Sequence, residues 1–252
     1  MRMDAYGRTD IGKVRKRNED SFIIDPEIRL LVVADGMGGH SSGDVASRMA
    51  VETVRDAMKR FFSDGARVPI LGKVDPKASE SANRLAASVR LSNQIIYETA
   101  RSKPQHQGMG TTIDCVLIHQ DGAAIAHVGD SRVYLVRNDA LNQLTEDHSL
   151  LGEQKKQGTL AAGEGARLQN ILTRALGVDA DTEVDIIETD LRPGDFLVAC
   201  TDGLNKVVPD SRILETVGRM KTPKMIAEHL VDLANAGGGV DNTTVVVARM
   251  EK

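Results

Sequence analysis

The pattern of apolar and polar residues predicts a core of strands that are buried on both faces. Residues 30–34 are apolar at every position, which favours a strand covered on both sides. The run ends on Asp35, and three of the next four residues are glycines. A charge at the end of a buried strand is costly without a partner, and glycines allow the backbone to approach a ligand. Asp35 is therefore a candidate site residue, although an aspartate that caps the following turn gives the same pattern.

The rest of the chain alternates between the periods of strands and helices. Helical spacing predicts helices at 43–62, from an Asp75-Pro76 N-cap to about 100, and from Thr222-Pro223 to 236. Strands are expected at 21–24, 28–35, 111–119, 123–128, 132–136, 183–189, 196–201 and 243–248. The three strands between 111 and 136 are expected to form one β-meander. Residues 145–181 are polar and rich in glycine, and we expect a mobile flap with short helices at 150–157 and 166–170.

Carboxylates recur at the ends of the predicted strands. If the first two strands pair antiparallel, Glu19 and Asp20 enter one strand where Asp35 leaves the other, so they meet at one edge of the sheet. The complete set of strand-end carboxylates is Glu19, Asp20, Asp35, Asp130, Asp202 and Asp241. Without a matching set of His or Cys, such a set favours Mg²⁺ or Mn²⁺ over zinc. Two ions about 3.5 to 4 Å apart can activate a water and neutralise a phosphoryl group, and Arg15 is the candidate phosphate anchor.

Composition narrows the range of partners. The chain has 252 residues and a formal net charge of -4, without a composition break between two halves. This balance argues against a nucleic-acid or membrane partner, and no run approaches the roughly 18 apolar residues of a membrane span. The N-terminus does not resemble a signal peptide, so we expect a cytoplasmic protein. Cys115 and Cys200 lie in apolar runs and are expected to be buried free thiols.

Six motifs, in this order, resemble those of the metal-dependent protein phosphatases of type 2C, in their short bacterial form. They are residues 15–20, 35–39, 110–112, 129–132, 201–203 and 241–244. The resemblance covers essentially the whole chain. It implies a single phosphatase domain over residues 1–252, with a flap subdomain at about 145–181. The implied fold is α+β, a four-layer αββα sandwich of two antiparallel sheets packed face to face, with helices on both outer faces and the metals at one edge.

The resemblance also implies a role for each carboxylate of a two-ion centre of Mn²⁺ or Mg²⁺. Asp35 would bridge the two ions, and the backbone carbonyl of Gly36 would complete the coordination of one of them. Asp202 and Asp241 would bind the other ion. The centre is therefore expected to draw on three motifs that are far apart in the chain.

The remaining roles are also carried over from the resemblance. Asp20 and Glu19 would hold metal-bound waters, with direct ligation by Asp20 left open. Asp130 would bind a third, weaker ion together with Asp202, and Arg15 would bind the substrate phosphate. The expected catalytic residues are thus Arg15, Asp20 and Asp35.

One position departs from the longer eukaryotic members, in which a histidine follows the Asp-Gly pair. Here Met37 takes that place, and the next histidine is His40. The general acid is left open between His40 and a water on the third metal, and His40 packing beside the site without a catalytic role is a further alternative. His148 is expected to be structural, at the base of the flap.

The implied function is a protein serine/threonine phosphatase. Hydroxide bridging two metals would attack the phosphate directly, without a phosphoenzyme, on proteins phosphorylated by a Ser/Thr kinase. A related alternative is a phosphatase dedicated to one regulator, although such relatives usually carry sensor domains and depart from the motif at 15–20. An alternative of another class is a pseudophosphatase that binds phosphoproteins or a kinase without turnover; it would be expected to lack a metal carboxylate, and none is missing. We expect a monomer.

Overall fold

Two antiparallel sheets form the centre of the molecule. The computed structural model describes residues 1–38, 42–64, 70–119, 122–158, 168 and 171–252. In spatial order, the first sheet contains β2 (Asp20–Asp25), β3 (Leu30–Met37), β5 (Ile113–His119), β6 (Gly122–Val128) and β9 (Asp185–Asp190), and β4 (Gly110–Thr111) pairs with the end of β3. The second sheet contains β1 (Arg2–Asp10), β11 (Thr243–Glu251), β10 (Phe196–Cys200), β7 (Arg132–Arg137) and β8 (Ala140–Gln143).

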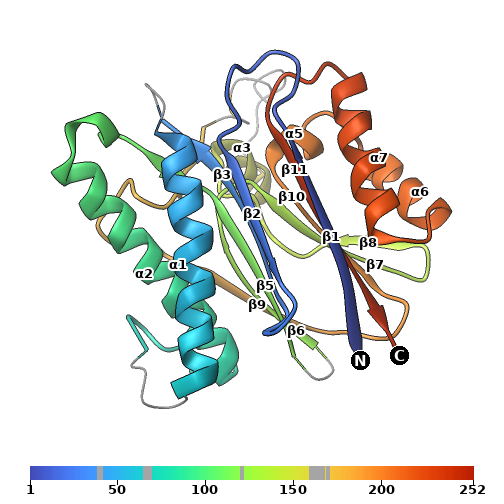
Figure 1. The fold of residues 1–252 in the computed structure, drawn as a ribbon, viewed down its shortest axis with the longest axis horizontal. Coiled ribbons are helices and arrows are strands. Elements are labelled where there is room, and N and C mark those ends of the chain that lie inside the picture. The colour runs from blue at the N-terminus through green and yellow to red at the C-terminus, as the bar shows by residue number, and fades with distance from the viewer. Residues whose placement is uncertain (39–41, 65–69, 120–121, 159–167, 169–170) are drawn as a thin grey trace.

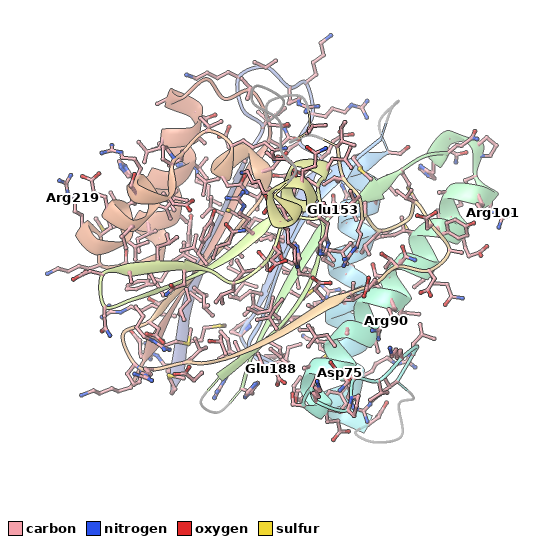
Figure 2. All side chains as sticks on the ribbon, turned by 180° about the vertical axis from the view of Figure 1, so that it is seen from behind. Asp75, Arg90, Arg101, Glu153, Glu188 and Arg219 are labelled. Carbon is pink, nitrogen blue, oxygen red and sulfur yellow. The ribbon has the colours of Figure 1, made fainter. Side chains whose placement is uncertain are left out.

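Helices cover the outer face of each sheet (Figure 1). The long helices α1 (Gly43–Asp64) and α2 (Glu80–Ser102) pack on the first sheet, and α6 (Asp210–Arg219) and α7 (Pro223–Ala236) pack on the second. Figure 2 shows these layers from behind, with Arg101 on α2 and Arg219 on α6 on opposite flanks. The predicted four-layer αββα sandwich is confirmed. Shorter helices lie in connecting segments: η2 (Pro104–His106), α3 (Leu150–Gln157) and α5 (Asp202–Asn205).

The continuous apolar run of β3 is explained by its place between two hydrophobic layers. Leu31 and Val33 contribute to the core between the sheets, whereas Leu30 and Val32 contribute to the core beneath α1 and α2. All four side chains are at most 1% exposed. Each such burial contributes roughly 1.5 to 3 kcal/mol to stability as an upper estimate, so both faces of this strand favour the fold.

The register of the first two strands brings carboxylates together as the sequence predicts. β2 and β3 pair antiparallel with Asp20 opposite Asp35. Because Asp20 begins its strand and Asp35 lies near the end of the other, both lie at the same edge of the first sheet.

The predicted β-meander is wrong, because β7 leaves the sheet that contains β5 and β6. β7 instead pairs with β8 and β10 in the second sheet. The chain crosses between the sheets at Gly129, whose φ of 120° lies in the region that favours glycine and whose missing Cβ would collide with Thr112. Two apolar strands joined by a short polar turn have the same local sequence pattern whether the second strand joins the same sheet or the facing one.

One further prediction about local structure is wrong. Helix α2 begins at Glu80 with Ser79 as its N-cap, not at Asp75, whose carboxylate instead accepts a hydrogen bond from the Lys77 amide at 2.9 Å. The sequence reading also missed β1 and α6. The second short helix, predicted at 166–170, lies outside the described residues except for residue 168.

The prediction for the two cysteines agrees with the structure. Cys115 and Cys200 are free and fully buried, as predicted. In the described part of the chain, we find no helix whose length and apolarity would allow it to cross a membrane.

Candidate active site

A cavity of about 790 Å³ opens at one edge of the sandwich. Its walls come from the loop between β1 and β2, the end of β3, α5 and the segment before β11, which meet at the upper edge of Figure 1. The site residues predicted from the sequence that line it are Arg15, Glu19, Asp35, Gly36, Asp130, Asp202 and Asp241. Asp20 lies behind this wall and is 7% exposed. His40 lies outside the described residues.

The backbone of Asp35 is fixed by the threonines of the 110–112 motif. Its amide donates a hydrogen bond to the Thr112 hydroxyl at 3.0 Å, and its carbonyl accepts bonds from the Thr111 hydroxyl and the Thr112 amide, each at 2.9 Å. The Thr112 hydroxyl is also 2.8 Å from that of Ser131, beside Asp130. These contacts hold the Asp35 carboxyl group at the cavity without occupying it.

Gly36 permits a close approach between β3 and the beginning of α1. A Cβ at Gly36 would collide with the backbone oxygens of Gly43 and Glu19. The Gly36 amide donates to the Glu19 carbonyl at 3.1 Å, and the Ser47 hydroxyl donates to the same carbonyl at 2.6 Å. The packing therefore explains the glycine of the Asp-Gly pair on steric grounds.

Asp20 connects the two sheets beneath the cavity. Its Oδ2 accepts hydrogen bonds from the hydroxyls of Thr201 at 2.8 Å and Thr244 at 2.7 Å, both from the second sheet side. No donor among the described residues reaches its buried Oδ1. Burial raises the pKa of Asp20 to about 7, and the charges of Asp202 and Asp241 act in the same direction, against the two threonine hydrogen bonds.

Asp202 and Asp241 are brought together by a tight contact between α5 and the segment before β11. A Cβ at Gly203 would collide with the backbone oxygen of Asn242, so this contact requires glycine. The Asp241 carboxylate accepts a hydrogen bond from the Asn242 amide at 2.8 Å. Two aspartates nearly 40 positions apart thereby line one cavity wall.

Asn242 also fixes the loop that carries Arg15. Its side-chain amide donates to the carbonyls of Ile11 and Arg17, each at 2.9 Å, and its oxygen accepts from the Glu19 amide at 2.8 Å. The Arg15 guanidinium, about half exposed at the cavity, is 2.7 Å from Asp241. That hydrogen bond is the main cause that raises the pKa of Arg15, so the guanidinium stays charged.

The carboxyl groups of the cavity repel one another. The pKa of Asp35 lies well above its usual range, first because the group is desolvated and then because Asp20 and Asp202 are close. Burial, followed by the charge of Asp202, raises the pKa of Asp130 to about 6, despite the opposing effect of Lys206. Such a cluster of mutually raised carboxyl groups favours the binding of cations.

Lys206 supplies a cation that the sequence reading missed. It follows α5, four residues after Asp202, and its Nζ lies 2.5 Å from Asp202 Oδ2 and 3.1 Å from Asp130 Oδ2. The signal was present in the sequence, because residues four apart lie on the same face of a helix. Thr201, Thr244 and Asn242 belong to quoted motifs, but their hydrogen-bonding roles could be found only from the fold.

The donor set suits two divalent cations. All the candidate side-chain ligands are carboxylates, which are hard oxygen donors, and the buried Oδ1 atoms of Asp20 and Asp202 receive no hydrogen bond from the described residues. As the side chains stand, the described residues contain no group of three His, Cys, Asp or Glu arranged to hold a metal ion. Asp241 is paired with Arg15 and Asp202 with Lys206, in each case through Oδ2, so metal binding requires local rearrangement of side chains.

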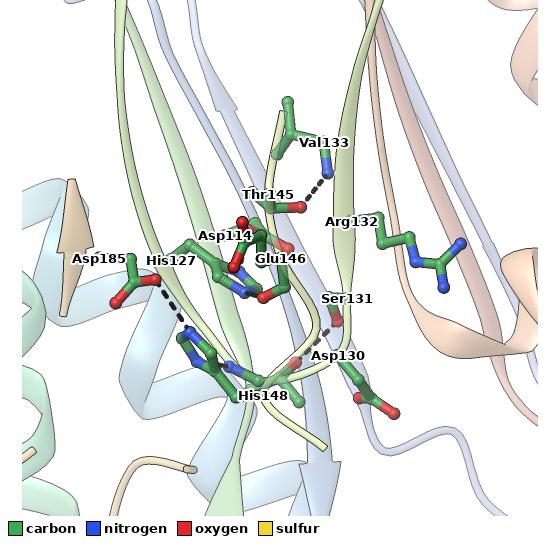
Figure 3. Close-up of polar contacts among 12 residues, drawn as sticks. Asp114, His127, Asp130, Ser131, Arg132, Val133, Thr145, Glu146, His148 and Asp185 are labelled. Atoms are coloured by element: carbon green, nitrogen blue, oxygen red, sulfur yellow. Dashed lines mark hydrogen bonds and ion pairs between the residues drawn. The ribbon is translucent and has the colours of Figure 1, made fainter. Parts of the chain in front are cut away.

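A buried polar cluster supports the cavity from the side of the flap (Figure 3). The ring nitrogens of His127 contact Asp114 Oδ1 at 2.7 Å and the Glu146 carbonyl at 2.8 Å. Burial opposes charge on His127, but Asp114 outweighs it and the pKa of His127 is raised. His148 accepts a hydrogen bond from the Gly129 amide at 3.1 Å and pairs with Asp185 at 3.1 Å. Its contacts therefore tie the start of the predicted flap to the segment that carries Asp130.

The geometry agrees with what comparison with known proteins finds. The family model described as protein phosphatase 2C matches residues 13–236. The serine/threonine phosphatase Stp of Listeria innocua is 38% identical over 250 residues, which cover 97% of this chain and 95% of that protein. The chain therefore belongs to the protein phosphatase 2C family.

Solved structures show the same similarity in three dimensions. The serine/threonine phosphatase PstP/Ppp of Mycobacterium tuberculosis has a TM-score of 0.86 at 32% identity, with 100% of each chain covered. The catalytic domain of a PstP, solved in complex with two manganese ions, has a TM-score of 0.83 at 34% identity, with 99% of each chain covered. The fold that carries the carboxylate-lined cavity is thus that of known phosphatases.

Proposed function

We propose that this chain hydrolyses phosphoserine and phosphothreonine on proteins, in a two-metal centre built around Asp35. The activity class is that of a metal-dependent serine/threonine protein phosphatase, as its family and its named relatives indicate. The observation that carries the proposal is the convergence of Asp35, Asp202 and Asp241, with Arg15, on one cavity. Mn²⁺ is the supported metal, because a similar catalytic domain was solved with two manganese ions.

Each residue of the cavity has a distinct part in this proposal. Asp35, the Gly36 carbonyl, Asp202 and Asp241 would hold the two ions, which when bound would acidify a water and neutralise the charge of the phosphoryl group. Their positions are supported by the steric contacts at Gly36 and Gly203. A rigid frame of this kind favours catalysis, because small displacements of reacting groups reduce the rate.

Arg15 and Asp20 would act on the substrate and the water. The planar guanidinium of Arg15 can bind two phosphate oxygens, and its half-exposed position at the cavity leaves it accessible to a phosphoprotein. Asp20 Oδ1 is an acceptor to which no described residue donates, and we propose that it orients a water beside Asp35. Glu19, which also lines the cavity, would assist by accepting a hydrogen bond from a second water.

The finer predictions remain inferences about this chain. We infer a single phosphatase domain over residues 1–252, supported by the length of the family match, with a flap at about 145–181 whose residues 171–175 line the cavity. Substrates phosphorylated by a Ser/Thr kinase, a monomeric state and a cytoplasmic location stay predictions from the sequence. So does a third, weaker ion between Asp130 and Asp202, where Lys206 now lies.

Hydrolysis assays test the proposed function directly. The purified chain is assayed on an aryl phosphate and a phosphothreonine peptide, first in EDTA and then with added Mn²⁺ or Mg²⁺. We expect activity on both substrates that depends on metal and is lost in Asp35→Asn. Asp56→Asn is the matched control, because Asp56 lies on the exposed surface of α1 beside Arg55. A folded chain that binds Mn²⁺ without hydrolysing either substrate would instead support a pseudophosphatase.

A further inference from the structure

Lys206 places a positive charge between two of the carboxylates assigned to metals. Its Nζ contacts the Oδ2 atoms of both Asp130 and Asp202, and only 23% of its side chain is exposed. The chain itself thus supplies a cation, the Lys206 ammonium group, to these two carboxylates of the cavity.

The position of this lysine is fixed by packed backbone. The Lys206 amide donates to the Asp202 carbonyl at 3.0 Å, and the neighbouring Asn205 side chain donates to the Asp130 carbonyl at 3.3 Å. The contact of Gly203 with Asn242 anchors the same turn. Lys206 is therefore held more firmly than a surface lysine on a mobile loop.

An ammonium group and a divalent ion compete for this place. A divalent ion binds carboxylate oxygens at roughly 2.0 to 2.6 Å, so an ion held between the Oδ2 atoms of Asp130 and Asp202 would take the place of the Lys206 ammonium group. Both cations together would also repel each other across a desolvated site. The buried Oδ1 atom of Asp202, however, receives no hydrogen bond from the part of the chain that the structure describes, and it can bind an ion on the side of Asp35.

We propose that Lys206 takes the place of the third metal ion, so that this phosphatase binds two ions and uses its own ammonium group to hold Asp130 and Asp202. The inference rests on the proposed two-metal centre, but it concerns a separate position. Asp202 would then bind a core ion through Oδ1 and Lys206 through Oδ2. The third ion implied by the resemblance would have no site in this chain while the lysine is present.

Counting bound Mn²⁺ tests the inference without relying on activity. Equilibrium dialysis over a series of Mn²⁺ concentrations, with metal measured by mass spectrometry, gives the number of specific sites. We expect about two ions for the wild type and about three for Lys206→Gln and Lys206→Met, since the released oxygens form a weaker additional site. Lys224→Gln is the matched control, because this lysine lies on α7 with 63% of its side chain exposed. Thermal melting confirms that each variant is folded.

Two further variants separate the possible outcomes. In Lys206→Gln/Asp130→Asn the additional ion should be lost, and in Asp35→Asn the two core ions should bind far more weakly. A wild type with three sites, one of them removed by Asp130→Asn, would overturn the inference while leaving the proposed function intact. The same holds if neither lysine variant gains an ion. A wild type that binds fewer than two ions would overturn the proposed function and this inference with it.

Discussion

The side chain of Asn242 should position the loop that carries Arg15. Asn242 is 5% exposed and makes three hydrogen bonds to backbone groups of residues 11–19. Asn242→Ala removes all three and leaves two carbonyls and one amide without their partner. Because Ile11 and Arg17 are exposed and water can reach them, the free-energy cost of the lost hydrogen bonds should be smaller than at a fully buried site.

The size of the effect follows from the number of bonds. At about 0.5 to 1.5 kcal/mol for each net hydrogen bond, and with part of the loss restored by water, the substitution should lower the free energy of unfolding by about 1 to 3 kcal/mol. For a chain of this size, each kcal/mol corresponds to roughly 2 to 4 °C in Tm. Asn142→Ala, in the exposed strand β8, is the matched control and should change Tm by much less.

The functional effect should be linked to Arg15. We expect Asn242→Ala to raise KM for an aryl phosphate about tenfold, because the phosphate anchor would no longer be held beside the cavity. Arg15→Ala should also raise KM, and in the Arg15→Ala background the Asn242 substitution should have little further effect on KM. The assay is a double-mutant cycle at saturating Mn²⁺. Independent, additive changes in KM, or a stability loss without any change in KM, would refute the positioning role.

Three further predictions concern the carboxylates and the glycine beside them. Asp35→Asn should lower kcat by roughly two orders of magnitude or more, because it removes the charge that would bridge the two ions. It should not lower Tm in EDTA, because it also removes a desolvated carboxylate that destabilises the fold. A variant with nearly wild-type activity in the aryl phosphate assay would disprove the bridging role. Without metal, the stability of Asp20→Asn relative to the wild type should increase by up to about 4 kcal/mol as the pH rises from about 4 to about 7. The reason is that the folded-state pKa of Asp20 is raised to about 7, so ionisation of this group in the wild type favours unfolding. Equal denaturation midpoints of the two proteins at both pH values would argue against this prediction. Gly36→Ala should lower the free energy of unfolding by roughly 2 kcal/mol or more, because its Cβ meets the Gly43 backbone, and urea denaturation that matches the wild type would contradict the steric argument.

Much of the sheet structure could be predicted from the sequence because its signals are local. The apolar run before Asp35 predicts a strand buried on both faces, and the chain order of the two strands predicts the meeting of Asp20 and Asp35. By contrast, β1 has no strong apolar pattern, because it lies at the edge of the second sheet and most of its residues are partly exposed. The helical pattern of α6, by contrast, is present in the sequence, because Ile213, Thr216 and Val217 lie at helical spacing and are buried, and the prediction overlooked it.

The sequence predicts which residues belong to the site better than it predicts the contacts between them. Strand-end carboxylates stand out in the sequence, since such groups are rarely buried without a role. The ion pairs of Arg15 with Asp241 and of Lys206 with Asp130 join segments far apart in the chain, and no local pattern could predict them. The same holds for the crossing at Gly129, which depends on which sheet receives the next strand.

The most direct test of the two-metal centre is a crystal structure of the chain grown with Mn²⁺, with data collected at the manganese absorption edge. We predict two strong anomalous peaks in the cavity, both within ligand distance of Asp35, with Gly36 on one and with Asp202 and Asp241 on the other. Lys206 should remain in contact with Asp130. Peaks that lie away from Asp35, or a cavity without manganese in a crystal that binds it elsewhere, would contradict the assignment.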